Sequence, residues 1–409
     1  MATSDDRATV ITGMGAVSAY GIGAAPLWEA LRAGRSSIAP LRHPRAAELR
    51  VEVAAQVPAD FNPGAHIAER TLTMLDRSAQ FALVAAAEAI AQSGLDFTLG
   101  DLSQRTGVIL GTGIGGETTH DEQSHRIYGE GATRVHPLTI VRLMPNAAAS
   151  QISIAHGLRG PAFVVASACA SSNHALAQAA QLIRSGLADV VVTGGTEACL
   201  TYGALRAWEA MRVLSDDTCR PFSANRRGLV LAEGAAVFVL ESRAHARARG
   251  ARILGRLAGI GMSSDAGDIV APDVVGASAA MTQALRDAEL SPKDVDYINA
   301  HGTGTVANDL AETRAIRRSF GAHADGLAVS STKSMHGHAL GAAGALELVA
   351  VLGALADGVL PPTLNLDVPD PECDLDYVAN APRQRAIRVA LSNSFAFGGL
   401  NAVLALTRD

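Results

Sequence analysis

Val164-Val165-Ala166-Ser167-Ala168-Cys169-Ala170-Ser171-Ser172-Asn173 places one cysteine where a β-branched, strand-like run turns into a helix. Apolar residues follow at helical spacing, at Ala175, Leu176, Ala179 and Ile183. We therefore expect the sulfur at a helix N-terminus, where unpaired N–H groups and the positive end of the helix dipole favour a thiolate. The pattern indicates a nucleophile, although a cysteine that only packs in the core fits it equally well.

Strand-like runs alternate with Gly-rich turns and Ala-rich helices on both sides of this stretch. We expect strands at 9–13, 106–111, 163–168 and 190–195, with helices at 78–93 and 171–186. A second alternating series has its strands at 253–261, 295–300, 327–331 and 388–392. This alternation predicts an α/β protein with buried, largely parallel strands. The basic segment 241–250 reads as a solvated helix and marks the boundary between a half at 1–250 and a half at 251–409.

Composition excludes several classes of function. Of the 409 residues 48% are hydrophobic, only 4% are aromatic and 40 are glycine, which suits a layered globular protein. A net charge of −6 gives no basic excess for nucleic acid. The cysteines, Cys169, Cys199, Cys219 and Cys373, are too scattered to indicate a disulfide framework or a metal site. We expect no bound metal and a reducing, cytoplasmic location.

Two segments bear on membranes and export. The polar start, Met1 to Asp6, leads directly into a strand, so we expect no signal peptide. The longest apolar stretch, Ala339 to Ala356, contains Glu347 and three glycines. A buried helix is therefore expected rather than a membrane span.

Three further segments carry ionisable or flexible groups. Tyr297 to Thr305 sets His301 at the end of a strand, before alternating glycines and threonines that let a ligand approach the backbone. Val329 to His338 places Lys333 and two histidines on one loop, a density that packing explains poorly. Leu391 to Asn401 is a strand followed by a Gly-flanked aromatic turn, which is either a mobile flap or an ordinary hairpin.

The segment Gly111 to Gly116 formally matches the dinucleotide-binding pattern G-x-G-x-x-G after a strand. The following residues, Glu117 to Gly131, are polar and lack the apolar face that a Rossmann helix needs. We therefore do not expect nucleotide binding.

Taken together, Cys169, His301, Lys333, Gly337-His338 and the run Asn393 to Gly399 resemble the β-ketoacyl-acyl-carrier-protein synthases, the elongating condensing enzymes of the thiolase superfamily. The resemblance spans essentially the whole chain and is greatest to the type II synthases of bacterial fatty-acid elongation. It implies a thiolase-like, five-layered α-β-α-β-α fold of two similar halves.

The resemblance also implies a reaction. Cys169 would take the acyl chain from the 4'-phosphopantetheine arm of acyl carrier protein, with the oxyanion held by the backbone N–H groups of Cys169 and Phe397. His301 and His338 would stabilise the thioenolate formed when malonyl-carrier protein loses carbon dioxide. Lys333 would support the site's electrostatics, paired with Glu347. No cofactor is bound by the enzyme itself in this scheme.

Further roles follow from the same resemblance. Thr303 and Thr305 would bind the pantetheine, and Asp309, Glu312 and Glu347 would be structural acids. The acyl pocket would be lined by Ile114, Thr139, Cys199, Trp208, Phe395 and Phe397, with Ile114 gating chain length at a dimer contact. The acidic carrier protein would dock on Arg70, Arg134 and Arg212. A homodimer is expected, with a heterodimer containing a chain-length-factor-like homologue as the alternative.

The chain departs from the family's usual pattern at Ala396, Leu400 and His336, where Gly, Thr and Thr are usual. If the flap needs a positive φ at position 396, alanine would restrict its opening. The changes favour a specialised pathway, such as a polyene, polyketide or nodulation-type acyl chain, over a housekeeping one. His336 also raises the question of which histidine acts, and the Gly-His pairing favours His338.

Two other functions compete with this one. A degradative thiolase would need a second cysteine as base near the C-terminus, but the only late cysteine, Cys373, lies before the flap in an acidic, Pro-containing segment. A non-catalytic partner subunit would lack the nucleophile. The chain could still be the catalytic half of a heterodimeric synthase.

Overall fold

Most strands form one mixed sheet of two parts in the computed structural model, which describes residues 6–409. We expected no signal peptide in the segment from Met1 to Asp6. Residues 1–5 of that segment lie outside the described residues. The first part contains β1 (Thr9–Ser18), β5 (Thr106–Gly111), β6 (Ala162–Val165), β7 (Val190–Glu197) and β8 (Gly234–Ser242). The second contains β9 (Gly255–Ser264), β10 (Tyr297–Asn299), β11 (Ala328–Ser330), β14 (Val389–Ala396) and β15 (Leu400–Thr407).

The two parts repeat one topology. With the strands of each part numbered in chain order, both read 3-2-4-5-1 from the outer edge to the centre. In both, the second strand is parallel to the third and fourth, and the fifth is antiparallel to its neighbours. Strands β1 and β9 join the parts at the centre by a short antiparallel contact. The predicted boundary near residue 250 stays a prediction.

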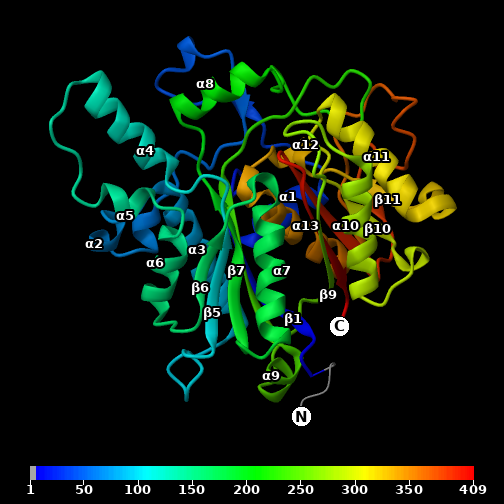
Figure 1. The fold of residues 1–409 in the computed structure, drawn as a ribbon, viewed down its shortest axis with the longest axis horizontal. Coiled ribbons are helices and arrows are strands. Elements are labelled where there is room, and N and C mark those ends of the chain that lie inside the picture. Colours follow the sequence, from blue (N-terminus) through cyan, green and yellow to red (C-terminus); the bar gives the residue numbers. More distant parts are fainter. Residues whose placement is uncertain (1–5) are drawn as a thin grey trace.

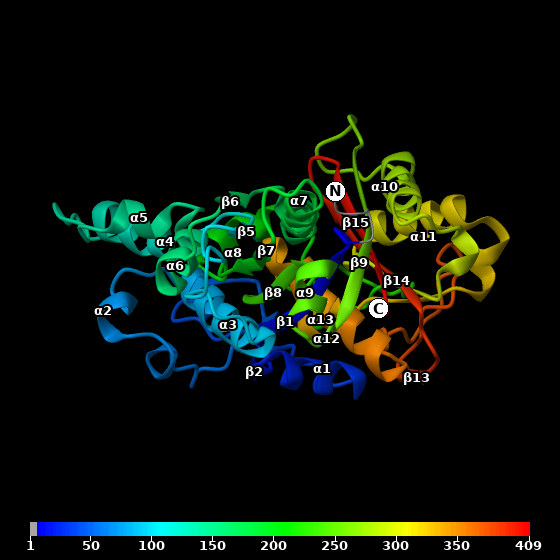
Figure 2. The ribbon, with the colours of Figure 1, turned by 90° about the horizontal axis from the view of Figure 1, so that it is seen from below.

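Helices cover both faces of each part and make the layers. α3 (Arg77–Ser93) packs on β1 and β8, and α10 (Val274–Asp287) packs on β9 and β15. Between the two parts lie α7 (Ser171–Arg184) and α13 (Ala343–Asp357), which contact each other and strands of both parts. In Figure 2, α7 and α13 lie between α3 and α10. The predicted five-layered, two-halved α/β fold is confirmed. The prediction of largely parallel strands is wrong, because the only parallel pairs are those made by the second strand of each part and the remaining pairs of the sheet are antiparallel.

The remaining elements extend this frame, and most are seen in Figure 1. On the outside lie α6 (Ala147–His156) beside α3 and α11 (Val306–Phe320) beside α10. The others are α1 (Ala24–Arg32), α2 (Glu69–Leu72), α4 (Glu117–Ser124), α5 (Thr139–Leu143), α8 (Tyr202–Met211), α9 (Arg243–Ala248), α12 (Lys333–His336), β2 (Gly21–Ile22), β3 (Ala39–Pro40), β4 (Val53–Ala54), β12 (Val359–Leu360) and β13 (Arg383–Gln384).

Local sequence accounts for the limits of the main helices. The Asp76 side chain accepts the Ser78 N–H to begin α3, and the helix ends at Gly94, whose φ of 68° only glycine adopts without cost. The basic segment after β8 forms only the short α9, because the antiparallel pairing of β8 with β1 runs on to Ser242. All six residues of β5 are buried, as expected for a parallel strand covered on both faces.

The long apolar segment lies inside the molecule. Among the described residues, one helical window, Leu340–Asp357, is long and apolar enough to cross a bilayer, and 89% of it is buried. Glu347 within it is fully buried and meets Lys333, as described below. The expectation of a buried helix is confirmed.

Trp28 of α1 packs against α13 in the central layer, and replacing it tests how much this contact stabilises the protein. Its ring packs on Gly353 of α13, and its Nε1 donates a hydrogen bond to Asp357 at 2.7 Å. Because this ring is nearly buried, Trp28→Ala should lower the free energy of unfolding by about 3–5 kcal/mol, measured by urea denaturation. Leu99→Ala, at an exposed position, is the matched control and should change it by less than about 0.5 kcal/mol. Equal effects would contradict this packing.

Candidate active site

Cys169 lies at the corner between β6 and α7, as the sequence predicts. A single 3₁₀ turn, Ala168–Ala170, separates strand and helix. Ala168 has a φ of 48°, a strained value for a residue with a side chain. Ser171 holds the turn, since its Oγ donates to the Ala168 carbonyl at 2.6 Å and accepts the Ser167 N–H at 2.9 Å. The strained turn presents Cys169 at its tip.

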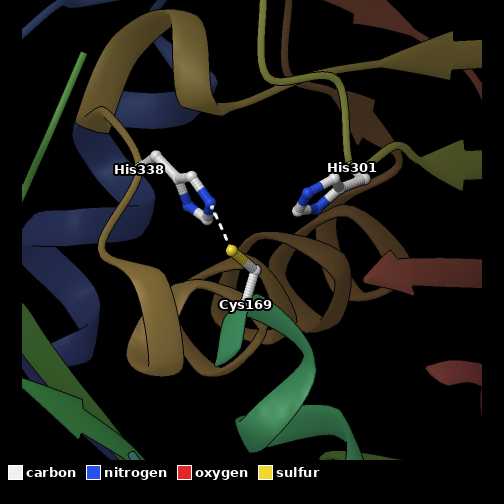
Figure 3. A group of neighbouring side chains, drawn as sticks. All are labelled: Cys169, His301 and His338. Carbon is white, nitrogen blue, oxygen red and sulfur yellow. Dashed lines mark hydrogen bonds between the residues drawn. The ribbon is translucent and has the colours of Figure 1, made fainter. Parts of the chain in front are cut away.

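His338 faces the thiol from the second half of the chain. Its backbone N–H donates to the Val230 carbonyl at 2.7 Å, and its carbonyl accepts the Ala232 N–H at 3.0 Å. Gly337 precedes it with a φ of 68°, and a Cβ there would lie 3.1 Å from the Val230 oxygen. His338 Nε2 lies 3.0 Å from Cys169 Sγ (Figure 3).

His301 completes the group at the end of β10. Both oxygens of buried Glu312 hold its loop, accepting the N–H groups of His301 at 2.8 Å and Gly302 at 2.7 Å. The ring stands edge-on to His338, with centroids 5.4 Å apart. Figure 3 shows both rings directed toward the sulfur from different segments.

Lys333 fixes the chemical form of His301. Its ammonium is fully buried, forms an ion pair with Glu347, and lies 3.4 Å from His301 Nδ1. An ammonium can only donate, so Nδ1 must be the acceptor and Nε2 must carry the ring proton. His301 therefore offers an N–H donor at Nε2, on a ring that lines the same cavity as the thiol. Burial, followed by the charge of Lys333, lowers the pKa of both His301 and His338 well below the usual range, so both rings are neutral.

One expectation about the thiol is wrong. Burial raises the pKa of Cys169 to about 12, and the Lys333 charge lowers it by less than burial raises it. The loss of water around the sulfur therefore outweighs the favourable end of the helix. The resting group is a neutral thiol beside a neutral imidazole, and deprotonation must accompany reaction.

An apolar cavity of about 100 Å³ opens onto the thiol and both imidazoles. Five of the residues assigned from the family resemblance line it: Trp208, Thr303, Thr305, Phe395 and Phe397. The Thr303 and Thr305 hydroxyls lie 2.9 Å apart, and the rings of Trp208 and Phe397 lie 6.1 Å apart. Apolar walls with a few polar groups suit an acyl chain on a polar arm.

Three residues assigned to the acyl pocket do not line this cavity. Ile114 is 45% exposed on the loop after β5. Thr139 begins α5, where its hydroxyl donates to the His136 carbonyl at 2.6 Å. Cys199 is buried against Glu197, 3.3 Å from its carboxylate. A pocket completed by a second chain, with Ile114 at the contact, stays a prediction.

The expected structural acids all bind backbone or a cation. Asp309 accepts the N–H groups of Phe222 at 2.7 Å and Gly304 at 3.2 Å, with the Arg226 guanidinium 3.8 Å away. It thereby orders the segment between the two cavity threonines. Burial raises the pKa of Asp309, while these contacts favour its charged form.

The three candidate docking arginines are exposed but dispersed. Arg212 ends α8 and adjoins Val213, which lines the cavity. Arg70 lies on α2, which Figure 1 places at the far edge from the second half, and Arg134 follows the turn after α4. Within one chain only Arg212 lies beside the cavity.

The structure clarifies the departures from the family pattern. Ala396 ends β14 in extended backbone, while Gly398 and Gly399 take the positive φ values, so alanine is not strained here. The aromatic segment forms a hairpin, and Leu400 begins the returning strand. His336 is buried, 3.0 Å from Thr332 Oγ1, and does not line the cavity. His338 is thus the histidine that meets the thiol.

Several other residues line the cavity although the sequence did not indicate them as site residues. Asn401, on β15, donates a 2.6 Å hydrogen bond to Asp265, and both residues line the cavity together with Val213 and Leu229. Asn401 is part of the aromatic motif, but the other three stand in loops without periodicity. Cys373, the base that a thiolase would need, is buried in a separate apolar cluster.

The ligand atoms of Cys169, His301 and His338 lie within 4.8 Å of one another, close enough to hold a metal ion together. A metal bound to Nε2 of His301 would replace the proton on that nitrogen, and His301 would then lose the N–H donor that the contact with Lys333 sets there. All four cysteines, each within the described residues, are free thiols.

The resting state of the thiol makes a chemical prediction. Because the pKa of Cys169 is raised, the thiolate fraction grows throughout the neutral range, and alkylation by iodoacetamide should accelerate about tenfold per pH unit from pH 6.5 to 9. Peptide mass spectrometry separates Cys169 from the three other cysteines. A rate that levels off by pH 7.5 would show a preformed thiolate and contradict this assignment.

Comparisons with known proteins agree with this geometry. Residues 6–246 match the family described as "Beta-ketoacyl synthase, N-terminal domain", and residues 254–367 match "Beta-ketoacyl synthase, C-terminal domain". Nodulation protein E of Rhizobium meliloti (strain 1021) is 50% identical over 98% of this chain and 99% of that protein. A 3-oxoacyl-(acyl-carrier-protein) synthase 2 of Coxiella burnetii is 40% identical over 99% of each chain.

A solved structure gives the same result. The ishigamide ketosynthase/chain length factor superposes with a TM-score of 0.93 at 35% identity, covering 98% of this chain and 99% of that one. The chain therefore belongs to the β-ketoacyl synthase family and is a condensing enzyme, a 3-oxoacyl-acyl-carrier-protein synthase.

Proposed function

We propose that this synthase elongates the acyl chain of a specialised product, of the nodulation type, rather than the bulk fatty acids of the cell. The 50% identity to Nodulation protein E exceeds the 40% identity to a synthase 2, and this difference supports the proposal. The departures at Ala396, Leu400 and His336 support it as well. The observation that carries the chemistry is the 3.0 Å contact between Cys169 Sγ and His338 Nε2 beside a second imidazole.

In the first half-reaction, Cys169 attacks the acyl thioester of the carrier protein. The Sγ–H proton passes to His338 Nε2 as the sulfur–carbon bond forms, and the departing pantetheine thiolate then takes that proton. The tetrahedral oxyanion is held by the N–H groups of Cys169 and Phe397. The products are an acyl-Cys169 thioester and free carrier protein, and both imidazoles end neutral.

In the second half-reaction, malonyl-carrier protein loses carbon dioxide and the electron pair forms a thioenolate. His301 Nε2–H donates to its oxygen. His338 Nδ1 has no hydrogen-bond partner within the described chain, so His338 can also take the tautomer that donates from Nε2. The thioenolate carbon attacks the carbonyl of acyl-Cys169, the bond from Sγ to the acyl carbon breaks, and the Cys169 thiolate takes a proton from solvent. Neutral rings donate without quenching the carbanion.

We propose that no metal or cofactor belongs to the resting enzyme, and that the phosphopantetheine arm enters past Thr303 and Thr305. The reaction needs N–H donors at the imidazoles, which a coordinated metal would remove. The acidic carrier protein docks near Arg212, with Arg70 and Arg134 contributed where two chains meet. The free thiols and the buried apolar helix support a cytoplasmic location.

A homodimer completes the proposal. One outer edge of the sheet is β6, a strand whose Phe163 is 39% exposed, and the nearby α6 exposes Ile154 at 72%. Unpaired strand edges and apolar side chains of this kind are usually covered by a partner. The alternative is a heterodimer with a chain-length-factor-like homologue, supported by the ketosynthase/chain length factor relative.

Acyl transfer provides the test of the nucleophile. Incubation with a panel of acyl-carrier proteins should add the mass of one acyl group to each chain, and Cys169→Ala should abolish the gain because the sulfur is removed. Intact-protein mass spectrometry measures this directly, and the preferred donor reports the pathway. An acyl group retained by Cys169→Ala would exclude Cys169, and a preference for ordinary saturated chains would contradict the specialised role.

Decarboxylation tests the two imidazoles separately. His301→Ala and His338→Ala should each reduce carbon dioxide release from malonyl-carrier protein at least about 100-fold, because each removes a donor to the thioenolate. His336→Ala is the matched control, a buried histidine outside the cavity, and folded His336→Ala protein should lose far less. Undiminished release in either cavity variant would refute that residue's part.

A further inference from the structure

The Gly111–Gly116 loop, which matches a phosphate-binding pattern, holds an anion that belongs to the chain itself. The Gly113 N–H donates to Glu197 Oε2 at 2.6 Å, and the Ile114 N–H donates to Glu197 Oε1 at 3.3 Å. Backbone N–H groups that would face a phosphate in a nucleotide site are thus satisfied internally. The loop is an internal carboxylate site.

Glu197 is an unusual residue for the interior. It ends β7, is fully buried, and forms no ion pair with any residue in the range 6–409. Its oxygens instead accept five hydrogen bonds, the others coming from Thr112 Oγ1 at 3.2 Å, Cys199 Sγ at 3.3 Å and the Gly341 N–H at 3.0 Å. Burying a carboxylate without a cation is costly, and only such a full set of donors offsets the cost.

Close packing around this carboxylate requires the two glycines on either side, since a Cβ at Gly341 would also lie 2.2 Å from the Gly113 nitrogen. A Cβ at Gly113 would lie 2.7 Å from Glu197 Oε2, and a Cβ at Gly341 would lie 2.6 Å from the same atom. Neither glycine has a positive φ, so backbone freedom does not explain them. We call the Glu197 carboxylate with the N–H groups of Gly113, Ile114 and Gly341 the Glu197 clamp.

The clamp reaches the nucleophile through the Gly341 peptide. While Glu197 accepts the Gly341 N–H, the Gly341 carbonyl accepts a hydrogen bond from Ser172, three residues after Cys169 on α7. Leu340, held at a φ of 47°, packs in the same apolar cluster as Cys169 and Cys199. One carboxylate therefore fixes the wall behind the thiol and the loop that carries Ile114.

We propose that Glu197 is a positioning residue that determines acyl-chain specificity, by clamping the Ile114 loop to the Leu340–Gly341 wall behind Cys169. The inference rests on the proposed function and on the expected acyl pocket, in which Ile114 contacts the acyl chain at the meeting point of two chains. His338 is held separately by the backbone of Val230 and Ala232. Loss of the clamp should therefore alter which acyl chains fit while the decarboxylating imidazoles stay in place.

Glu197→Gln tests this directly. It replaces one carboxylate oxygen, an acceptor, by an amide nitrogen, a donor, and this nitrogen must then face backbone N–H groups that also donate. We expect the ratio of acylation rates with hexadecanoyl and octanoyl carrier proteins to change by about fivefold or more. Carbon dioxide release from malonyl-carrier protein should stay within about twofold of the unchanged enzyme. Glu88→Gln is the matched control, since Glu88 also accepts two backbone N–H groups, from Ala16 at 2.9 Å and Ala24 at 3.0 Å, but lines no part of the cavity.

Gly113→Ala is a second route to the same displacement and should shift the ratio as Glu197→Gln does. A merely structural role would reduce acylation and decarboxylation together and leave the ratio unchanged in folded protein, and that result overturns the inference. An equal shift with Glu88→Gln would overturn it as well. If the unchanged enzyme takes up no acyl group on Cys169, the proposed function fails first, and the ratio cannot be formed.

Discussion

The buried ammonium of Lys333 is the constraint on which the active site depends. It is fully buried with two partners, the Glu347 carboxylate and His301 Nδ1, from different segments of the second half. Removing one member of such a pair strands a charge in the interior, at a cost of about 3–5 kcal/mol. The ammonium therefore orders α12 and α13, sets the tautomer of His301, and adds to the effect of burial in keeping both imidazoles neutral.

The repeated topology explains how the reacting groups meet. In each half the third strand leads to the central layer: β6 leads to Cys169 and α7, and β11 leads to Lys333, His338 and α13. The second strand of each half ends in a Gly-rich loop, after β5 at Gly111 and after β10 at His301. The segments after the third strands thus supply the nucleophile from one half and His338 from the other, while His301 comes from the loop after the second strand of the second half. The glycine loops of the two halves have diverged, since one holds Glu197 and the other carries His301.

Much of this was predictable from sequence because the informative signals are local. The strand at Thr106–Gly111, the corner at Cys169 and the buried apolar helix follow from periodicity and residue type alone. Lys333 with Glu347, and the threonines beside His301, needed the family resemblance as well. The prediction of a thiolate at Cys169 is wrong because it used only the local helix end. The loss of solvent around the sulfur, which raises the pKa of the thiol, is caused by segments distant in sequence.

The cavity was predicted least well, for the same reason. Ile114, Thr139 and Cys199 do not line it in one chain, while Val213, Leu229 and Asp265 come from loops that no pattern marks. Glu197 carries no sequence signal beyond its place after two glycines, and its importance appears only when Gly113 and Gly341 converge on it. Residues that act through burial and tertiary contact are invisible to periodicity.

The most direct test of the account is the protonation state of His301, observed by nitrogen NMR of histidine-labelled enzyme. The account predicts a neutral ring with the proton on Nε2 and an acceptor at Nδ1, unchanged as the pH falls through 6.5, because burial and Lys333 lower its pKa well below that value. The signal is assigned with His301→Gln. A ring that becomes charged near pH 6.5, or that carries its proton on Nδ1, would contradict the claim that Lys333 prepares the site.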